Sequence, residues 1–490
     1  MWSKKLALVL SIAAALLVLA GVAAFDRTRH TEIATELPDY VTLITKEDSG
    51  IAVSVSTEST AQTESVQIAD LGLSCQARGG NTYALTWNEV AGASYAVQLS
   101  EDGEHWQTIA EIPADQECSY TTQPLEAFQT YWLSVTAVGV QTHSEPVTVT
   151  TEEKLLYSTI WPLMDQPVYG DAAATQKLGT ASAGSSWCVL GMEGQYLKIR
   201  FDGQDGYIDS DYCMINLPEY VGQLCNYNIT NSYCSAFLVH EYEIDNVSGT
   251  VLAGYENVQT GEGTYLVPLL FPAAQKLINA GQSAREQGYT LTIYDSFRPK
   301  NTTDQIYSRT TAILDDVLPE TTFRGRDVTD LDLLAWKGKT VTYQILMTNN
   351  GAYNLGSFLA PGNSRHNFGV AVDLTMVDVE GREVAMQTPI HDLSWYSATD
   401  RNNSSADLLR KFMMDAGFKD LVSEWWHFSD AELYNRNAYK PLKTGVSWAC
   451  WVYDGTGWRY RMADGSFYTD CTEVIGENTY TFDANGYTNY

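Results

Sequence analysis

The chain has 490 residues, too many for one ordinary domain, so several domains of typical size are expected. Hydrophobic residues make up 44% of the sequence and aromatic residues 12%, which is typical of globular proteins and excludes wholesale disorder. With 30 Lys and Arg against 60 Asp and Glu, the formal charge is −30, so charge repulsion argues against binding to nucleic acid or to anionic lipid headgroups.

Residues 1–25 have the pattern of an export segment. Lys4 and Lys5 form a short basic region, and the following apolar run leads into the small residues of GVAAFD. This pattern is typical of a secretory signal peptide. The apolar run is also nearly long enough to stay in a membrane as an uncleaved signal anchor. On either reading we predict that the rest of the chain lies outside the cytoplasm, either secreted or anchored to the cell membrane.

Two segments with different patterns follow the export segment. Residues 26–72 are rich in Thr, Ser and Glu without a sustained hydrophobic period, which predicts a disordered stalk. Residues 73–151 alternate apolar and polar residues between turn clusters, which predicts a β-sandwich. The expected strands at 83–90 and 131–138 resemble the B and F strands of a fibronectin type III domain, with Trp87 in the core.

Short β-runs also fill residues 155–216 and the C-terminal tail, residues 445–490. The first of these segments resembles a bacterial SH3-like barrel, a module that often binds cell-wall peptides. The tail places turn pairs at Asp464-Gly465 and Asn485-Gly486 between aromatic runs, which predicts two similar hairpins. It resembles the choline- or glucan-binding repeats of Gram-positive surface proteins, although Cys471-Thr472-Glu473 occupies a position where those repeats usually carry tryptophan. A small structural cap is the alternative.

The eight cysteines are an even number, which permits disulfides in an exported chain. They fall into neighbouring pairs that follow the predicted domains. Four bonds are therefore hypothesised: Cys75 with Cys118, Cys188 with Cys213, Cys225 with Cys234, and Cys450 with Cys471. The sequence contains no CxxC, so a zinc-ribbon site is not expected.

Residues 217–435 mix helical patterns with short strands. Apolar residues recur at helical spacing over 271–289 and 403–418, and apolar runs lie between and after them. This mixture predicts an α+β domain. The sequence therefore predicts a multidomain chain in which two all-β modules precede an α+β domain and a small β-hairpin repeat tail follows it.

Two motifs in the α+β block combine histidines with acidic residues. His366 lies in SRHNFGVAVD at 364–373, where Gly369 permits a sharp bend and Asp373 follows within an apolar strand. A charged residue in such a strand is costly to bury unless it is paired or bound to a metal. His427 lies in EWWHF, three residues after Glu424 and behind two tryptophans that form a dry wall.

Two histidines and one carboxylate, with a position left open for water, form the usual catalytic zinc site. Zinc lowers the pKa of its water and polarises the scissile carbonyl. A nearby carboxylate must still take the water proton and pass it to the leaving amine, and Glu424 is suited to that role. Each residue alone is more often structural, whereas their combination within one block is more specific.

These motifs resemble those of a known family. SRHNFGVAVDLTM is similar to the SxHxxGxAxD signature of the D-alanyl-D-alanine dipeptidase group, within the zinc D-Ala-D-Ala metallopeptidases linked to vancomycin resistance. EWWHF is similar to the second signature of that group, and YDSFRPKNTTDQ at 294–305 is similar to its upstream arginine segment. The resemblance covers roughly 220–430 and implies an α+β zinc peptidase domain.

The resemblance also implies roles for individual residues. It implies three zinc ligands: His366, Asp373 and His427. It implies that Glu424 is the general base and then the general acid, and that Arg298 stabilises the oxyanion of the tetrahedral intermediate. Ser364 and Asp295 are implied as substrate-binding residues, Ser364 through the substrate amine, and Asp295 could also orient Arg298.

The substrate class is the remaining question. Carboxypeptidase relatives usually read E-P-W-H in the second motif, so Trp425 in place of proline favours a small pocket for a dipeptide. The export segment favours wall-derived peptides or stem-peptide termini as substrates. We therefore predict an exported zinc metallopeptidase that cleaves D-Ala-D-Ala-type bonds and has peptidoglycan or D-Ala-containing peptides as partners. A D,D-carboxypeptidase or endopeptidase on polymeric peptidoglycan, and an inactive cell-wall-binding protein, are the alternatives.

Overall fold

The computed structural model describes residues 70–490, except for 141, 230–235, 253, 255–258, 262–263, 319–339 and 436–438. The predicted export segment and nearly all of the predicted stalk therefore lie outside the described residues. The described residues all belong to one unit, Gln67–Tyr490. Across that described part, no helix has both the length and the apolar character needed to cross a membrane.

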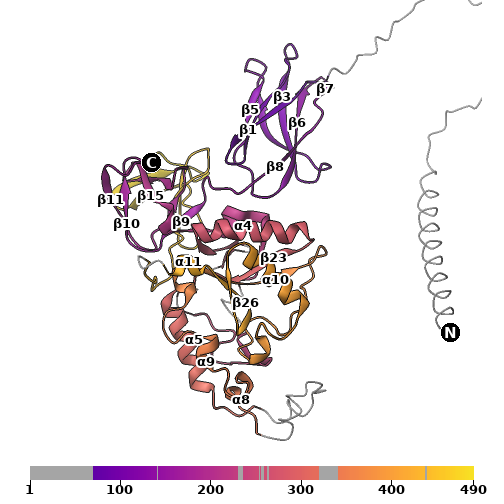
Figure 1. Cartoon of the computed structure of the whole chain (residues 1–490). Helices are drawn as coiled ribbons and strands as arrows, with labels where there is room; N and C mark the ends of the chain where they lie inside the picture. The colour runs from indigo at the N-terminus through magenta and orange to yellow at the C-terminus, as the bar shows by residue number, and fades with distance from the viewer. Residues whose placement is uncertain are drawn as a thin grey trace, which may run out of the picture. The chain divides into compact units, whose positions relative to one another are not determined.

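The first module contains two antiparallel sheets (Figure 1). One sheet contains β1 (Ser74–Gly79), β2 (Thr82–Thr86) and β5 (Ser119–Thr121). The other contains β4 (Gln107–Ile112), β3 (Ser94–Ser100), β6 (Thr130–Val138), β7 (Thr142–His143) and β8 (Val147–Thr150). Trp87 is buried in the core and meets the Tyr95 ring edge-on, with ring centroids 5.4 Å apart. This arrangement is compatible with the predicted β-sandwich.

The second module is built from eight short strands, β9 to β16. Their bounds are β9 (Thr159–Pro162), β10 (Gln166–Tyr169), β11 (Lys177–Ala181), β12 (Trp187–Cys188), β13 (Gly191–Glu193), β14 (Tyr196–Phe201), β15 (Gln204–Asp209) and β16 (Cys213–Asn216), with a 3-10 turn, η1 (Ser210–Tyr212), before β16. β16 pairs on one side with β9 and on the other with β22 (Pro268–Leu270). Because this sheet crosses the predicted boundary at 216, the second module and the α+β domain share one hydrophobic core.

The α+β domain is organised around a sheet with the order β17-β23-β24-β26-β25. These strands are β17 (Cys225–Tyr227), β23 (Thr290–Asp295), β24 (Ala371–Val377), β26 (Glu424–Ser429) and β25 (Lys419–Leu421). β17 runs parallel to β23, and the other neighbours are antiparallel. β24 and β26 are buried almost throughout, so their side chains are shielded on both faces of the sheet.

Two long helices pack against each other and against this sheet (Figure 1). α4 (Phe271–Glu286) begins with proline in its first turn, where the missing N–H costs no hydrogen bond, and buries an apolar stripe that includes Leu277. α10 (Ser404–Asp415) is capped at its N-terminus by Asn403, whose side chain accepts hydrogen bonds from two backbone N–H groups. Gly288 and Gly417, which follow the two helices, both have positive φ, as expected for residues that end a helix.

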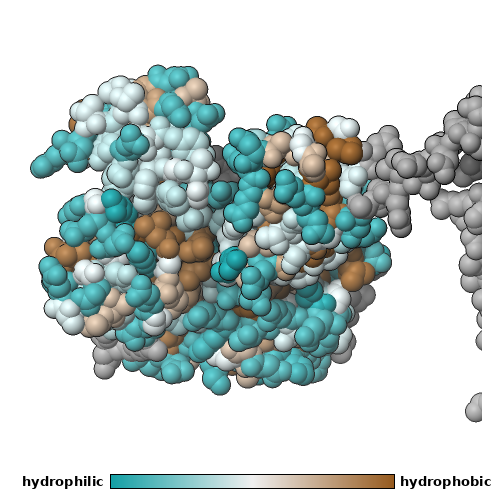
Figure 2. Space-filling model, turned by 90° about the horizontal axis from the view of Figure 1, so that it is seen from above, coloured by the Kyte–Doolittle hydropathy of each residue, from teal (hydrophilic) through white to brown (hydrophobic). Residues whose placement is uncertain are grey.

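The remaining elements complete the domain. They are α2 (Leu217–Val221), η2 (Gly222–Leu224), β18 (Leu238–Val239), β19 (Tyr242–Glu243), β20 (Gln259–Gly261), β21 (Thr264–Tyr265), α5 (Lys300–Ile313), α8 (Tyr343–Met347), α9 (Leu355–Phe358), η3 (Arg365–Phe368), η4 (Trp395–Ser397) and α11 (Ala431–Tyr434). Of these, α9 and η3 contribute residues to the cavity that holds the candidate site. The face drawn in Figure 2 is mostly hydrophilic, with separate hydrophobic patches, in keeping with the high share of acidic residues.

The tail forms two hairpins, β27 (Cys450–Tyr453) with β28 (Trp458–Arg461), and β29 (Cys471–Ile475) with β30 (Asn478–Phe482). The loops that join the paired strands lie at 454–457 and 476–477. The chain also turns at the two predicted positions, where Gly465 and Gly486 have positive φ and donate backbone hydrogen bonds to Met462 and Asp483. Across the first of these turns Arg461 forms an antiparallel bridge with Phe467.

The predicted disulfides are not formed within the described residues. Seven of the cysteines are free, and Cys234 lies outside the described residues. Cys188 lies against β27 instead of Cys213, with its Sγ 3.5 Å from the backbone nitrogen of Tyr453. The Cys450 Sγ accepts a hydrogen bond from Arg461 at 3.3 Å. Proximity in sequence did not predict the neighbour of Cys188, because packing places its thiol against the tail.

Candidate active site

Three neighbouring strands bring the separate motifs together. Asp373 on β24 is the cross-strand partner of Asp295 on β23 and of His427 on β26. Directly opposed residues in a sheet present their side chains on the same face. Residues that are distant in the sequence therefore meet at the centre of the sheet.

His366 reaches the same place from η3. The Ser364 hydroxyl accepts a hydrogen bond from the His366 N–H at 3.3 Å, and the Asn367 carboxamide oxygen accepts one from the Ser364 N–H at 2.7 Å. Gly369 ends the turn with φ +62°, and a Cβ there would lie 2.8 Å from the Met214 sulfur. The sharp bend expected at Gly369 is thus present, and it leads the chain directly into β24.

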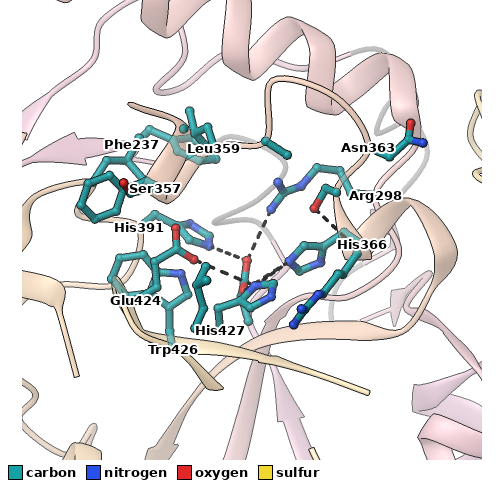
Figure 3. Close-up of a pocket in the computed structure, with 18 of the residues that line it drawn as sticks. Phe237, Arg298, Ser357, Leu359, Asn363, His366, His391, Glu424, Trp426 and His427 are labelled. Carbon is teal, nitrogen blue, oxygen red and sulfur yellow. Dashed lines mark hydrogen bonds and ion pairs between the residues drawn. The ribbon is translucent and has the colours of Figure 1, made fainter. Parts of the chain in front are cut away.

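The side chains of His366, Asp373 and His427 form a compact set of donor atoms, all within 4.8 Å of one another (Figure 3). His366 Nε2 lies 3.1 Å from His427 Nδ1, and Asp373 Oδ1 lies 3.3 Å and 3.0 Å from these two nitrogens. Donors around a tetrahedral zinc are separated by roughly 3.3–3.6 Å, given zinc–donor bonds of about 2.0–2.2 Å. The separations and the donor types therefore fit a small divalent cation.

A backbone carbonyl sets the tautomer of His366. Its Nδ1 lies 2.6 Å from the Ser296 carbonyl oxygen. Because a carbonyl can only accept, Nδ1 carries the proton and Nε2 presents a lone pair toward Asp373 and His427. This is the usual way in which a metal-binding histidine is oriented, and the motif spacing alone did not reveal it.

The two buried carboxylates of the site have opposite electrostatics. Burial would raise the pKa of Asp373, but the adjacent imidazoles, His366 first and then His391 and His427, hold it well below its ordinary value. Burial raises the pKa of Glu424 well above its ordinary value, and the negative charge of Asp373 adds to this effect. Asp373 is thus suited to stay ionised, whereas Glu424 is suited to exchange a proton.

Arg298 is held rigidly beside these carboxylates. Its Nε and Nη2 donate to Asp295 Oδ2 at 2.8 Å and 2.6 Å, and Nη2 lies 3.4 Å from Asp373 Oδ2. Its backbone N–H donates to the His366 carbonyl at 3.1 Å. Asp295 thus orients Arg298, and it is not among the residues that line the cavity. This position favours the orienting role over direct substrate contact.

A cavity of about 280 Å³ opens over these residues (Figure 3). Its lining includes Ser364 and Arg298 together with hydrophobic side chains: Phe237, Phe358, Leu359 and Trp426. Trp425 is buried behind the cavity, and its indole N–H donates to the Thr388 hydroxyl at 3.0 Å. The expectation that Trp425 narrows the pocket to dipeptide size is therefore wrong.

The sequence motifs did not single out His391 as part of this site. His391 lines the cavity, and its Nε2 lies 3.4 Å from Asp373 Oδ2. Phe237 also lines it, from the segment before β18. Neither residue belongs to a short pattern of chemically suggestive neighbours, so only the fold reveals them.

Comparisons with known proteins include a family match over the same part of the chain. Residues 268–430 match the family model of VanY, D-alanyl-D-alanine carboxypeptidase. This match supports the interpretation of residues 268–430 as a VanY-like peptidase. The chain is also 24% identical over 191 residues to a D-alanyl-D-alanine dipeptidase from Enterococcus faecium, which covers 38% of this chain and 80% of the relative. Both matches support an enzyme that acts on D-Ala-D-Ala.

Solved structures resemble parts of the chain only weakly. A myokine structure matches with 21% identity and a TM-score of 0.15, over 17% of this chain and 96% of the myokine chain. Domains d3–d4 of the rat CD45 extracellular region match with 12% identity and a TM-score of 0.15, over 24% of this chain and 84% of that chain. Scores this low carry no argument about the fold.

Proposed function

We propose that this protein is an exported zinc metallopeptidase that hydrolyses D-Ala-D-Ala-type bonds of cell-wall peptides. The observation that carries the proposal is the convergence of His366, Asp373 and His427 beside Glu424 and Arg298 in one cavity. The VanY-like match supports peptidase action on D-Ala-D-Ala. Zinc is the proposed metal because two imidazole nitrogens and one carboxylate oxygen are its usual donors at catalytic sites.

His366, Asp373 and His427 would hold the zinc, which when bound lowers the pKa of a water molecule and polarises the scissile carbonyl. Glu424 takes the proton of the attacking water and then passes it to the leaving amine. The raised pKa of Glu424 suits both steps, since a group with such a pKa can accept a proton and give it back.

Arg298 provides fixed positive charge for the oxyanion that develops on the substrate carbonyl. Asp295 holds the guanidinium by two hydrogen bonds, so it does not have to reorganise when the oxyanion forms. Burial raises the pKa of Glu424, and the charge of Arg298 opposes part of this rise. Ser364 lines the same cavity and remains the proposed contact for the substrate amine.

One observation favours the D,D-carboxypeptidase alternative over a dipeptidase. Among the described residues that line the cavity, the carboxylates are Asp373 and Glu424, and the mechanism uses both. The free ammonium of a dipeptide would find no further carboxylate there, whereas a peptide whose amine is acylated brings no ammonium into the cavity. With Trp425 outside the cavity, no residue of the second motif argues for the dipeptide.

The other parts of the chain define where the enzyme would act. Export by residues 1–25, as a cleaved signal or as a membrane anchor, stays a proposal, as does the stalk. We propose that the fibronectin type III-like, SH3-like and repeat-like modules hold the peptidase at the cell wall. Peptidoglycan is accordingly the proposed partner.

The full chain should cleave both D-Ala-D-Ala and an N-acetylated peptide that ends in D-Ala-D-Ala. Product analysis shows which of the two substrates is cleaved faster. Cleavage should stop with a chelator and return with zinc.

Glu424→Gln should lower kcat by about 10²–10⁴-fold while the protein keeps its metal, because a proton-transfer group is lost. Glu432→Gln, at a side chain that is 80% exposed, is the matched control. A Glu424→Gln protein as active as this control would refute the mechanism.

A further inference from the structure

His391 is a buried histidine that the proposed mechanism does not use. Its side chain is 3% exposed, and it lies in the loop between β24 and η4. Its backbone has φ +59°, in the left-handed region that a non-glycine residue occupies only at a cost of roughly 1–2 kcal/mol. Such strain is commonly found where the surrounding structure must hold a side chain in a functional position.

The surrounding structure holds His391 at both backbone and ring. The His391 carbonyl accepts a hydrogen bond from the Leu238 N–H at 3.1 Å, and the Leu393 N–H donates to the Leu238 carbonyl at 2.8 Å. The imidazole stacks on Phe237 with ring centroids 5.0 Å apart and an interplanar angle of 9°. Trp426 meets the ring edge-on, with centroids 5.9 Å apart. The ring therefore has little freedom to turn.

The ring of His391 has a polar neighbour in Asp373. Its Nε2 lies 3.4 Å from Asp373 Oδ2, and within the described ranges neither ring nitrogen forms a hydrogen bond in this structure. In Figure 3 the imidazole points from one side of the cavity toward the carboxylate at its centre. A buried imidazole with no alternative partner is costly unless it uses this contact.

The two oxygens of Asp373 face different groups. Oδ1 faces His366 and His427, at 3.3 Å and 3.0 Å. Oδ2 faces Arg298 and His391, each at 3.4 Å. Arg298 is bound more closely by Asp295, at 2.6 Å, and so it is only a secondary partner for Asp373.

We propose that His391 is a positioning residue for Asp373. It donates its Nε2 proton to Asp373 Oδ2, and this keeps Oδ1 turned toward His366 and His427. The inference rests on the proposed function, in which Oδ1 is a metal donor. A hydrogen bond to the outer oxygen of a ligating carboxylate orients that ligand and raises metal affinity.

Two variants of the full chain separate the hydrogen bond from ring packing. His391→Phe keeps an aromatic ring between Phe237 and Trp426 but has no N–H, whereas His391→Gln restores an N–H donor. Zinc affinity is measured by competition with a chromophoric chelator, and the donor geometry by the visible absorption of the cobalt-substituted protein. His240→Phe is the matched control, because His240 stacks on Tyr396 and does not line the cavity.

We expect His391→Phe to bind zinc about 10–100-fold more weakly and to shift the cobalt spectrum. His391→Gln should recover most of the affinity, and His240→Phe should match the wild type. Wild-type zinc affinity and cobalt spectrum in His391→Phe would overturn the inference. So would a His391→Gln protein that binds zinc as weakly as His391→Phe, or a cobalt spectrum showing that His391 is itself a metal ligand. If one of these outcomes is found while turnover stays at the wild-type level, the inference fails and the proposed function stands. A wild-type chain that binds no zinc would overturn both.

Discussion

At the scale of single residues, burial has different consequences for the three acidic groups near the cavity. Asp373 is kept ionised by the histidines around it, so its pKa is lowered in spite of burial. Glu424 has fewer compensating partners, and its pKa is raised by burial and by the charge of Asp373. Burial also raises the pKa of Asp392 to about 6, although the backbone N–H groups of His240 and Glu241 donate to it. The identity of the neighbours therefore decides the direction of each shift.

Asp392 provides a test of stability against pH. Its pKa rises from 3.8 to about 6 on folding, so the folded state retains a proton that the unfolded state releases. The stabilisation is complete below about pH 4 and is lost as the pH rises through about 6. The fall amounts to roughly 3 kcal/mol at most, at about 1.4 kcal/mol per pKa unit. Asp392→Asn cannot ionise and should therefore lack this fall.

The measurement is the free energy of unfolding of wild type and Asp392→Asn between pH 4 and 7. The difference between the two proteins isolates Asp392 from the other acidic groups of the chain. A constant difference over this range would show that Asp392 does not keep its proton in the folded protein.

At the scale of elements, the site depends on strand register and on one tight turn. The pairing of Asp373 with His427 and with Asp295 places all three side chains together, and a slip of one residue would move Asp373 to the other face of the sheet. Gly369 then allows η3 to deliver His366 one turn before β24 begins. The positions of the site side chains therefore depend on this strand register and on this turn.

Gly369→Ala should therefore be strongly destabilising. The left-handed backbone costs about 1–2 kcal/mol for alanine, and the contact of 2.8 Å with the Met214 sulfur adds the cost of overpacking. Zinc affinity should also fall, because the displaced turn carries His366. Thermal unfolding and chelator competition measure the two effects.

Gly381→Ala is the matched control for Gly369→Ala. Gly381 has φ +75°, and an added Cβ would meet no heavy atom within 4 Å in the described part of the structure. It should show the backbone cost alone and keep its zinc affinity. Equal losses in the two variants would mean that the contact with Met214 is unimportant.

At the scale of the whole molecule, the tail is joined to the second module by buried polar contacts. Arg461 on β28 donates to the Thr159 hydroxyl at 2.7 Å, and its Nη1 lies 3.3 Å from Glu219. Its guanidinium also stacks on Trp448, 3.4 Å from the ring centroid. The Trp161 indole N–H donates to the Ser447 carbonyl at 2.7 Å. Because β16 also pairs with β22, the second module, the peptidase domain and the tail form one connected structure.

Arg461→Met should loosen the tail without affecting catalysis. Loss of the buried guanidinium leaves Thr159 and Glu219 without this donor, so cleavage of the tail in limited proteolysis should become at least about tenfold faster, equivalent to ~1.4 kcal/mol. Turnover of a small peptide should stay at the wild-type level. Arg459→Met is the control, because Arg459 stacks on Phe467 and Tyr487 within the tail. Equal proteolysis of the two variants would argue against Arg461 as the link.

Much of the candidate site could be predicted from local patterns. A histidine before a tight turn and an acidic residue in an apolar strand are costly to bury without a partner. SRHNFGVAVD and EWWHF could therefore be recognised from the sequence as candidate site motifs. The same reasoning anticipated the helices at α4 and α10 and their glycine stops. It was wrong about Trp425, because neighbours in a strand can point to opposite faces and only packing decides which face lines a cavity.

The sequence by itself determined the residue types of the site, the order of its motifs and the mixture of β modules with an α+β domain. Only the tertiary structure decided which partners these residues have. The contacts of His391, of the Ser296 carbonyl and of Cys188 all depend on segments distant in sequence. Local patterns report the energetic cost of burying a group, whereas the partner that offsets this cost is set by strand pairing and packing across the whole chain.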